Sequence, residues 1–222
     1  MAQYALLRFA SESEFLEHAI DDFKALSQKA ILKRGKFSVA LSGGNTPKVL
    51  FEALAKTEID WSKIHFYWGD ERYVPYADPA SNFGMAQKIL FSHINIPAAN
   101  IHPIPVGSQD PHEAARKYED LIKNLQFDLI YLGIGLDGHT ASLFPGILLP
   151  TNTKVSALYV HKLASYRISL MPDCINSARE IRFLVSGSGK QAILDYITQV
   201  PEPPTRYPCQ LIKDCTIFAY GV

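Results

Sequence analysis

The chain has 222 residues, and its 22 Lys and Arg residues balance 22 Asp and Glu residues, so the formal net charge at pH 7 is zero. This length suits one domain over residues 1–222, and the balanced charge argues against nucleic acid or an acidic membrane surface as a partner. Because the N-terminus has no signal-peptide pattern and no apolar run approaches the ~20 residues of a membrane span, we expect a cytoplasmic protein.

Helix-like and strand-like segments alternate along the chain. Apolar residues at helical spacing predict a helix at 11–34, and a β-forming run predicts a strand at 37–41. There follow predicted helices at about 47–56, 81–92 and 111–125, strands at 64–68 and 127–132, and an ordered loop at 95–111. Further strands are expected near 155–160, 166–170, 180–186 and 215–220, a helix at about 189–199, and a stiff connector at 201–204.

This alternation predicts an α/β fold: a single Rossmann-like domain with a mainly parallel β-sheet and helices on both faces. Ligands of such folds bind beyond the carboxyl ends of the strands, so the loops at those ends are the places to look for function.

The loop after the first predicted strand, SGGNTP (42–47), has the character of an anion site. Its two glycines allow close backbone approach, Thr46 is suited to cap the next helix, and Pro47 suits the first helical position. Free amides at the positive end of a helix favour a phosphate, and an ordinary strand-to-helix turn is an equally good interpretation of the loop taken alone. The candidate binding residues are Ser42, Gly43, Gly44, Asn45 and Thr46.

The second strand-end loop, GDERYVP (69–75), carries three consecutive charges. Such a run is most often a solvated loop. Arg72 is nonetheless well suited to a phosphate or carboxylate because its guanidinium donates in a planar fork, and Asp70 or Glu71 could hold it in place.

The third loop, GIGLDGHT (133–140), places Asp137 and His139 after the buried strand at 127–132. An acid and a histidine at a sheet edge indicate proton chemistry, with Asp137 orienting the imidazole or the substrate. A helical segment at 140–144 would put His139 at its positive end and favour the neutral imidazole, and Ser142 would then be a helix-packing residue.

The same loop matches the dinucleotide-binding fingerprint GxGxxG, but this alternative fails within the sequence. The fingerprint requires an acid about 20 residues on, whereas residues 138–172 contain no Asp or Glu. Asp137 would also repel a pyrophosphate. We therefore expect no nucleotide cofactor.

The acid-free span contains Lys154, Lys162 and Arg167, and Lys190 follows in another strand-end loop. Cations gathered near strand ends favour a small anionic ligand. For Lys154 and Lys162 a solvated surface position is the better interpretation, and for Arg167 the two alternatives are even. The histidines are scattered and the three cysteines lack metal-ligand spacing, so we predict no metal site and reduced thiols.

Together the motifs SGGNTP (42–47), GDERYVP (69–75), SNF (81–83) and GIGLDGHTASLFPG (133–146) resemble the 6-phosphogluconolactonase family. The similarity is in register over about 37–195, with RISL (167–170) and GSGK (187–190) matching more loosely. One departure is the C-terminus, CTIFAYGV, where the family usually has a tryptophan-containing strand and an aspartate.

The resemblance implies a Rossmann-like fold and cofactor-free hydrolysis of 6-phospho-D-glucono-1,5-lactone to 6-phosphogluconate, the second step of the oxidative pentose phosphate pathway. It also implies that His139 activates water with Asp137 beside it, while Arg72 and Lys190 hold the phosphate with the loop at 42–44. The expected partner is a small phosphosugar lactone, and the expected state is a monomer or weak homodimer.

Two other functions stay open on the sequence. Glucosamine-6-phosphate deaminases are similar in these motifs but have a glutamate five residues after the histidine, where this chain has Phe144. A catalytically silent sugar-phosphate sensor would usually carry a helix-turn-helix module, for which the first 36 residues, with one amphipathic helix, offer too little.

Overall fold

The computed structural model describes residues 4–107, 110–199 and 207–222, so the predicted connector at 201–204 lies outside the described residues. Six strands form one sheet in which every pairing is parallel. Their spatial order is β1 (Tyr4–Phe9), β9 (Cys215–Tyr220), β8 (Ile181–Ser186), β5 (Leu129–Leu132), β2 (Phe37–Leu41) and β3 (Ile64–Trp68). The predicted mainly parallel, Rossmann-like sheet is confirmed.

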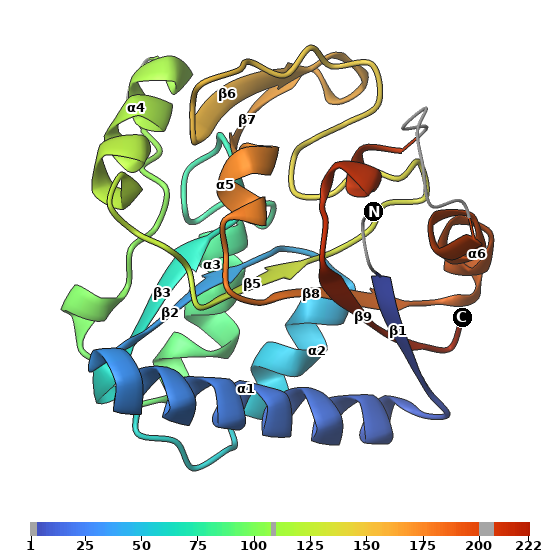
Figure 1. The fold of residues 1–222 in the computed structure, drawn as a ribbon. Coiled ribbons are helices and arrows are strands. Elements are labelled where there is room, and N and C mark those ends of the chain that lie inside the picture. The colour runs from blue at the N-terminus through green and yellow to red at the C-terminus, as the bar shows by residue number, and fades with distance from the viewer. Residues whose placement is uncertain (1–3, 108–109, 200–206) are drawn as a thin grey trace.

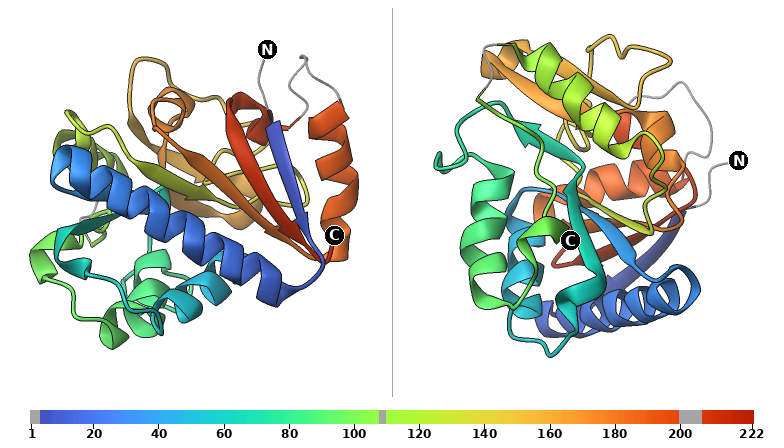
Figure 2. Two further views of the ribbon diagram at one scale, coloured as in Figure 1. Left: turned by 60° about the horizontal axis from the view of Figure 1, so that its bottom comes forward. Right: turned by 90° about the vertical axis from the view of Figure 1, so that its left-hand side faces the viewer.

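Helices flank this sheet on both sides (Figure 1). The α-helices are α1 (Glu12–Arg34), α2 (Asn45–Leu54), α3 (Asn82–Ile89), α4 (Pro111–Ile122), α5 (Pro172–Asn176) and α6 (Gln191–Gln199). Short 3₁₀ turns are η1 (Trp61–Lys63), η2 (Phe91–His93), η3 (Ala98–Asn100), η4 (His161–Leu163), η5 (Ser188–Lys190) and η6 (Pro208–Leu211). In Figure 2, left, α1 runs across the sheet, and α2 and α3 lie on the same side.

A second, three-stranded antiparallel sheet lies over the other face, together with α4 and α5 (Figure 1). It consists of β4 (Asp70–Arg72), β7 (Ser165–Leu170) and β6 (Val155–Val160), in that order. Helix α4 packs on the β6–β7 hairpin. The two strands predicted at 155–160 and 166–170 therefore leave the main sheet and build this small sheet above its carboxyl edge.

The long first helix shows how local sequence sets the element bounds. Ser11 caps α1 by accepting a hydrogen bond from the Glu14 amide at 3.2 Å, and Gly35 ends it in the left-handed conformation at φ 77°. Phe15, Ala19 and Phe23 recur every four residues and are fully buried, so one stripe of the helix packs on the sheet.

Strand β1 was not predicted from the sequence, and it forms the edge of the sheet beside β9. The partners Tyr4 and Cys215 are more than 200 residues apart, so nothing local marks this pairing. The unusual C-terminal segment packs normally: β9 lies between β1 and β8, and Ile217 and Phe218 are buried.

The neighbouring strands β8, β5, β2 and β3 bring four loops to one edge of the sheet, because parallel strands end on the same side. These are the loops that begin at Gly187, Gly133, Ser42 and Gly69. Within the described residues, no helix is long and apolar enough to cross a membrane.

Candidate active site

A pocket of about 510 Å³ opens where the four loops meet. Nine predicted site residues line it, namely Ser42, Gly43, Gly44, Asn45, Thr46, Asp70, Arg72, His139 and Lys190. The lining also includes Gly133, Ile134, Gly135 and residues 184–187. Of the predicted set, Asp137 and Arg167 stand outside this lining in the described structure.

The glycine loop at 42–46 forms one wall, although its helix begins earlier than predicted. Helix α2 starts at Asn45 and its N-cap is Gly44, at φ 106°, so the prediction that Thr46 caps the helix is wrong. Thr46 instead pairs its hydroxyl with that of Ser186 at 2.7 Å, which ties the loop to β8. The first-turn amides of α2 point toward the pocket. Because the glycine cap has no side chain that could bond them, they can donate hydrogen bonds to a ligand there.

The charged run 70–72 is a strand, β4, and the expectation of a solvated loop is wrong for its two acids. Glu71 is 1% exposed and accepts 2.7 Å hydrogen bonds from the amides of Arg72, Asn82 and Phe83, and one of 3.0 Å from the Ser81 hydroxyl. Burial raises the pKa of Glu71, and the three amide donors oppose that effect. The carboxylate thus anchors the start of α3 to β4.

Asp70 is also buried, and its partners come from two distant segments. It accepts a hydrogen bond from the Ser142 hydroxyl at 2.7 Å and one from the Asn82 side-chain amide at 3.3 Å. Ser142 is therefore a cross-link between the histidine loop and β4, contrary to the helix-packing role expected from the sequence.

Arg72 extends along the pocket without an ion pair to either neighbouring acid in the described part of the chain. Its guanidinium donates a 2.6 Å hydrogen bond to the Ala80 carbonyl instead. Glu71 thus holds Arg72 only through its backbone amide, and the guanidinium is held by the backbone at Ala80.

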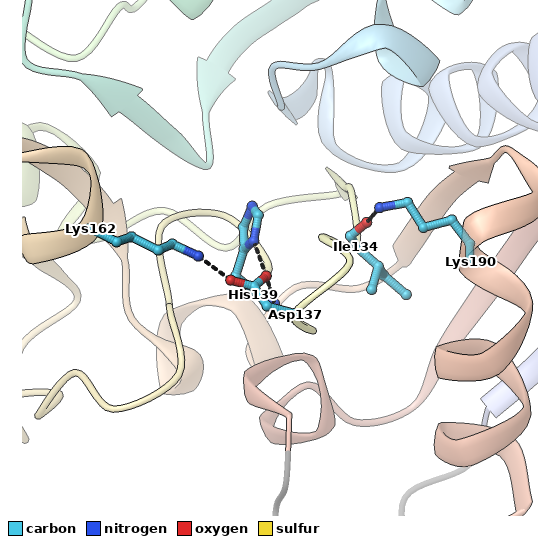
Figure 3. Close-up of polar contacts among 5 residues, drawn as sticks. All are labelled: Ile134, Asp137, His139, Lys162 and Lys190. Atoms are coloured by element: carbon cyan, nitrogen blue, oxygen red, sulfur yellow. Dashed lines mark hydrogen bonds and ion pairs between the residues drawn. The ribbon is translucent and has the colours of Figure 1, made fainter.

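Asp137 and His139 form a hydrogen-bonded pair on the loop after β5 (Figure 3). Oδ1 of Asp137 lies 2.5 Å from Nδ1 of His139 and also accepts the His139 amide at 3.2 Å. Gly135 makes this possible, since a Cβ at that position would lie 2.0 Å from His139 Nδ1. With Nδ1 donating to the carboxylate, Nε2 is the imidazole nitrogen that accepts a proton.

The segment after His139 is a turn closed by a bridge between Thr140 and Leu143, so the helix considered for 140–144 does not form. His139 therefore does not lie at the positive end of a helix. Ala141 adopts φ 46°, which is incompatible with a continuing helix. The turn instead brings Phe144 onto His139, with ring centroids 4.2 Å apart and planes 26° from parallel.

Lys162 also reaches this pair. Its side chain is exposed, as expected, at 51%, but it is not without a partner. Its ammonium donates to Oδ2 of Asp137, the oxygen that His139 leaves free (Figure 3). Burial disfavours the ionised carboxyl, but the hydrogen bonds from Lys162 and His139 outweigh this and hold the pKa of Asp137 well below its ordinary value. Asp137 is therefore ionised at neutral pH.

Lys190 lines the opposite side of the pocket and donates a 2.6 Å hydrogen bond to the Ile134 carbonyl (Figure 3). Burial lowers the pKa of Lys190, and the charge of Asp137 partly opposes this. Arg167 lies opposite Arg72 in the β4–β7 ladder, and its Nε is buried with no hydrogen-bond partner among the described residues. Burial, and next the charge of Arg72, lower the pKa of Arg167.

Asn82, Ser142, Phe144 and Lys162 were missed by the sequence interpretation as members of this site. The one signal for Lys162 was the acid-free span that follows His139, where a cation has no local partner. The other three are joined to the site through contacts that no local pattern announces. Among the described residues, no group of three or more His, Cys, Asp or Glu side chains gathers to hold a metal ion.

Comparison with known proteins places the chain among sugar-phosphate enzymes. Residues 10–218 match the family model described as glucosamine-6-phosphate isomerases/6-phosphogluconolactonase. The chain is 43% identical over 194 residues to the 6-phosphogluconolactonase of Synechocystis sp., which covers 83% of this chain and 81% of that protein. It is 44% identical over 184 residues to that of Haemophilus influenzae, covering 79% of each.

The crystal structure of 6-phosphogluconolactonase from Thermotoga maritima superposes with a TM-score of 0.87 at 29% identity, covering 99% of this chain and 100% of that one. The resemblance inferred from the motifs is thereby confirmed. The chain belongs to the glucosamine-6-phosphate isomerase/6-phosphogluconolactonase family.

Proposed function

We propose that this chain, working as one α/β domain, hydrolyses 6-phospho-D-glucono-1,5-lactone to 6-phospho-D-gluconate, with His139 as the general base. The relatives named above support this substrate and reaction. The observation that carries the role of His139 is the 2.5 Å contact between its Nδ1 and the ionised Asp137, at the wall of the pocket.

The chemistry follows from that contact. Nε2 of His139 takes a proton from a water molecule as the water oxygen attacks the lactone carbonyl carbon. The tetrahedral intermediate then collapses, the bond from the carbonyl carbon to the ring oxygen breaks, and the imidazolium returns its proton to that oxygen. Asp137 stabilises the imidazolium and keeps Nδ1 protonated throughout. Because a lactone is an activated ester, a positioned base and water suffice without a covalent intermediate.

The phosphate of the substrate fits the part of the pocket that is lined by the start of α2, Arg72 and Lys190. The first-turn amides of α2 and the side chains of Arg72 and Lys190 supply donors and positive charge there. Arg167 adds to the positive potential from beside Arg72. Binding energy from this remote group holds the carbonyl carbon against the water and so contributes to the rate.

The deaminase alternative requires a carboxylate at the position of Phe144. Here that side chain is an aromatic ring stacked on His139, and it has no proton to transfer. The structure offers no observation that favours the sensor alternative, since the Asp137–His139 pair is assembled for proton transfer.

The direct test is acid release from freshly made 6-phosphogluconolactone at controlled pH, with the spontaneous rate subtracted. The wild type should accelerate hydrolysis, His139→Ala should lose most turnover while affinity for 6-phosphogluconate stays within about threefold, and Arg72→Ala should mainly raise KM. Full activity of His139→Ala would refute the base assignment, and an unreactive wild type would refute the function. Glucosamine 6-phosphate, offered in parallel, should not be turned over.

A further inference from the structure

The turn of the β6–β7 hairpin reaches over the loop that carries Asp137 and His139. This turn is η4 (His161–Leu163), followed by Ala164 in the left-handed conformation at φ 46°. It presents the Lys162 ammonium to Oδ2 of Asp137, 4.5 Å from the centroid of the Phe144 ring. Figure 3 shows Lys162 approaching Asp137 from the side away from Lys190.

Lys162 completes a closed set of contacts around the base. Each oxygen of Asp137 accepts from a different residue: Oδ1 accepts from His139, and Oδ2 accepts from Lys162. Phe144 lies against both partners, stacked on the imidazole at 4.2 Å and beneath the ammonium. Lys162 stands outside the described lining of the pocket, so its contact is with the orienting acid and not with the space for substrate.

We propose that Lys162 is a positioning residue for lactone hydrolysis, which fixes the Asp137 carboxylate so that His139 is held in the orientation and protonation state of a base. This inference rests on the proposed role of His139.

Two physical effects support the assignment. First, a carboxylate bound at both oxygens cannot rotate about its terminal torsion without losing a charge-assisted hydrogen bond, so the imidazole that it orients keeps its direction. Second, a lone carboxylate beside an imidazole favours the imidazolium, which cannot accept a proton, and a cation on the far oxygen reduces that tendency.

Other charged groups face the same pair and would be unchanged in a Lys162 variant. Asp70 and Arg72 on β4 line the pocket with His139, and Lys190 in η5 does so from the other side. On the side of η6, Tyr207 lies close to Gly138, and the Cys209 amide donates to the Gly138 carbonyl at 2.9 Å. Lys162 therefore contributes the one charge on the hairpin side that directly contacts Asp137 in the described structure.

The test compares Lys162→Met, which keeps most of the length of the side chain without its charge, with Lys162→Arg, which keeps the charge. Lys154→Met is a matched control, because Lys154 lies at the start of the same hairpin and donates to the Lys123 carbonyl. The measurements are kcat and KM for 6-phosphogluconolactone from about pH 5 to pH 8, with the spontaneous rate subtracted, and the melting temperature of each variant.

We expect Lys162→Met to lower kcat by about tenfold or more while KM changes less than about threefold, and to move the acid limb of kcat/KM to higher pH by about half a unit. Lys162→Arg should restore most of kcat, and Lys154→Met should match the wild type. An unchanged kcat and acid limb in Lys162→Met would overturn the proposal, as would a rise in KM alone, which would indicate substrate binding.

A second measurement separates this inference from the proposed function. Imidazole NMR titration, with the His139 signal identified by its absence in His139→Gln, should show the His139 midpoint at higher pH in Lys162→Met than in the wild type. If the wild type does not hydrolyse the lactone, the proposed function fails and this titration still decides the coupling of Lys162 to His139. Identical midpoints in the two proteins would overturn the coupling whatever the activity.

Discussion

Arg167 lies directly opposite Arg72 in the antiparallel pairing of β7 with β4. Two guanidinium groups thus share one end of the small sheet, and in the described part of the chain the Nε of Arg167 is buried without a hydrogen-bond partner. Like charges at opposed positions of a sheet destabilise it, as does a buried donor without an acceptor. The carboxylates of Asp70 and Glu71 partly offset the repulsion, and an anion bound near both guanidinium groups would offset it further.

Arg167→Met should therefore raise the melting temperature of the ligand-free protein and weaken substrate binding at the same time. The guanidinium costs folding free energy, as the lowered pKa of Arg167 from burial and from Arg72 indicates. We expect KM to rise about threefold to tenfold, the effect of roughly 1 kcal/mol of lost attraction. Thermal melting measures the change in stability and steady-state kinetics measures the change in KM, with Arg167→Lys as the charge-retaining control. A lower melting temperature would show that Arg167 has partners that stabilise the fold.

Gly135→Ala should inactivate the site without unfolding the chain. Its Cβ would lie 2.0 Å from His139 Nδ1 and 2.7 Å from Asp137 Oδ1, so the pair must move apart. A displacement of this size costs about 100-fold in kcat. Gly133→Ala is the comparison, since a Cβ there meets nothing within 4 Å, and it should lose far less. Equal activity of the two variants would contradict the importance of the Asp137–His139 contact.

Glu71→Gln should destabilise the protein by about 2–4 kcal/mol, because a neutral amide cannot accept hydrogen bonds at both of its terminal atoms. Two of the buried donors among Arg72, Ser81, Asn82 and Phe83 would then face an amide nitrogen. Urea unfolding measures the change. Glu52→Gln, at an exposed pair with Lys48, should stay within about 0.5 kcal/mol of wild type. A similarly small effect of Glu71→Gln would mean that its carboxylate is dispensable.

Acidification should lower the free energy of unfolding through a pair of histidines, His65 on β3 and His102. His65 Nδ1 and His102 Nε2 lie 3.1 Å apart, and burial lowers the pKa of both, with the charge of Lys36 adding to it. A pKa below the unfolded value of about 6.5 means that the stabilising contribution is present above that pH and is lost as the pH falls through the folded value.

The measurement for this pair is the free energy of unfolding in urea between about pH 7.5 and pH 5. Wild type should lose more stability over this range than the double variant His65→Gln/His102→Gln, because both histidines must take up protons on unfolding. Parallel curves for the two proteins would exclude the pair as the source of acid sensitivity.

The local sequence was enough to predict the alternation of strands and helices and three of the four loops that form the pocket. Asp137 and His139 are two residues apart, so their contact depends only on one glycine-containing turn. The buried strands β2 and β5 are short runs dominated by apolar residues, and the glycines in the loops that follow them are visible in the sequence.

Contacts between residues far apart in the chain decided the features that local sequence did not predict. Strand β1 exists through its pairing with β9, Ser142 reaches Asp70 across 72 residues, and Thr46 bonds Ser186 across 140. The helix considered for 140–144 does not form, because the contacts of Phe144 and Ser142 favour a turn over local helix propensity.

Lys162 shows most clearly the difference between what the local sequence predicts and what the tertiary structure decides. By itself it is an ordinary lysine in a hairpin turn, with no local feature that separates it from Lys154. Only the packing of the small sheet above the edge of the large one brings its ammonium to Asp137. Residue type and spacing therefore determined the chemistry available at this site, and the tertiary fold decided which charges act together, because electrostatic contacts depend on distance in space and not along the chain.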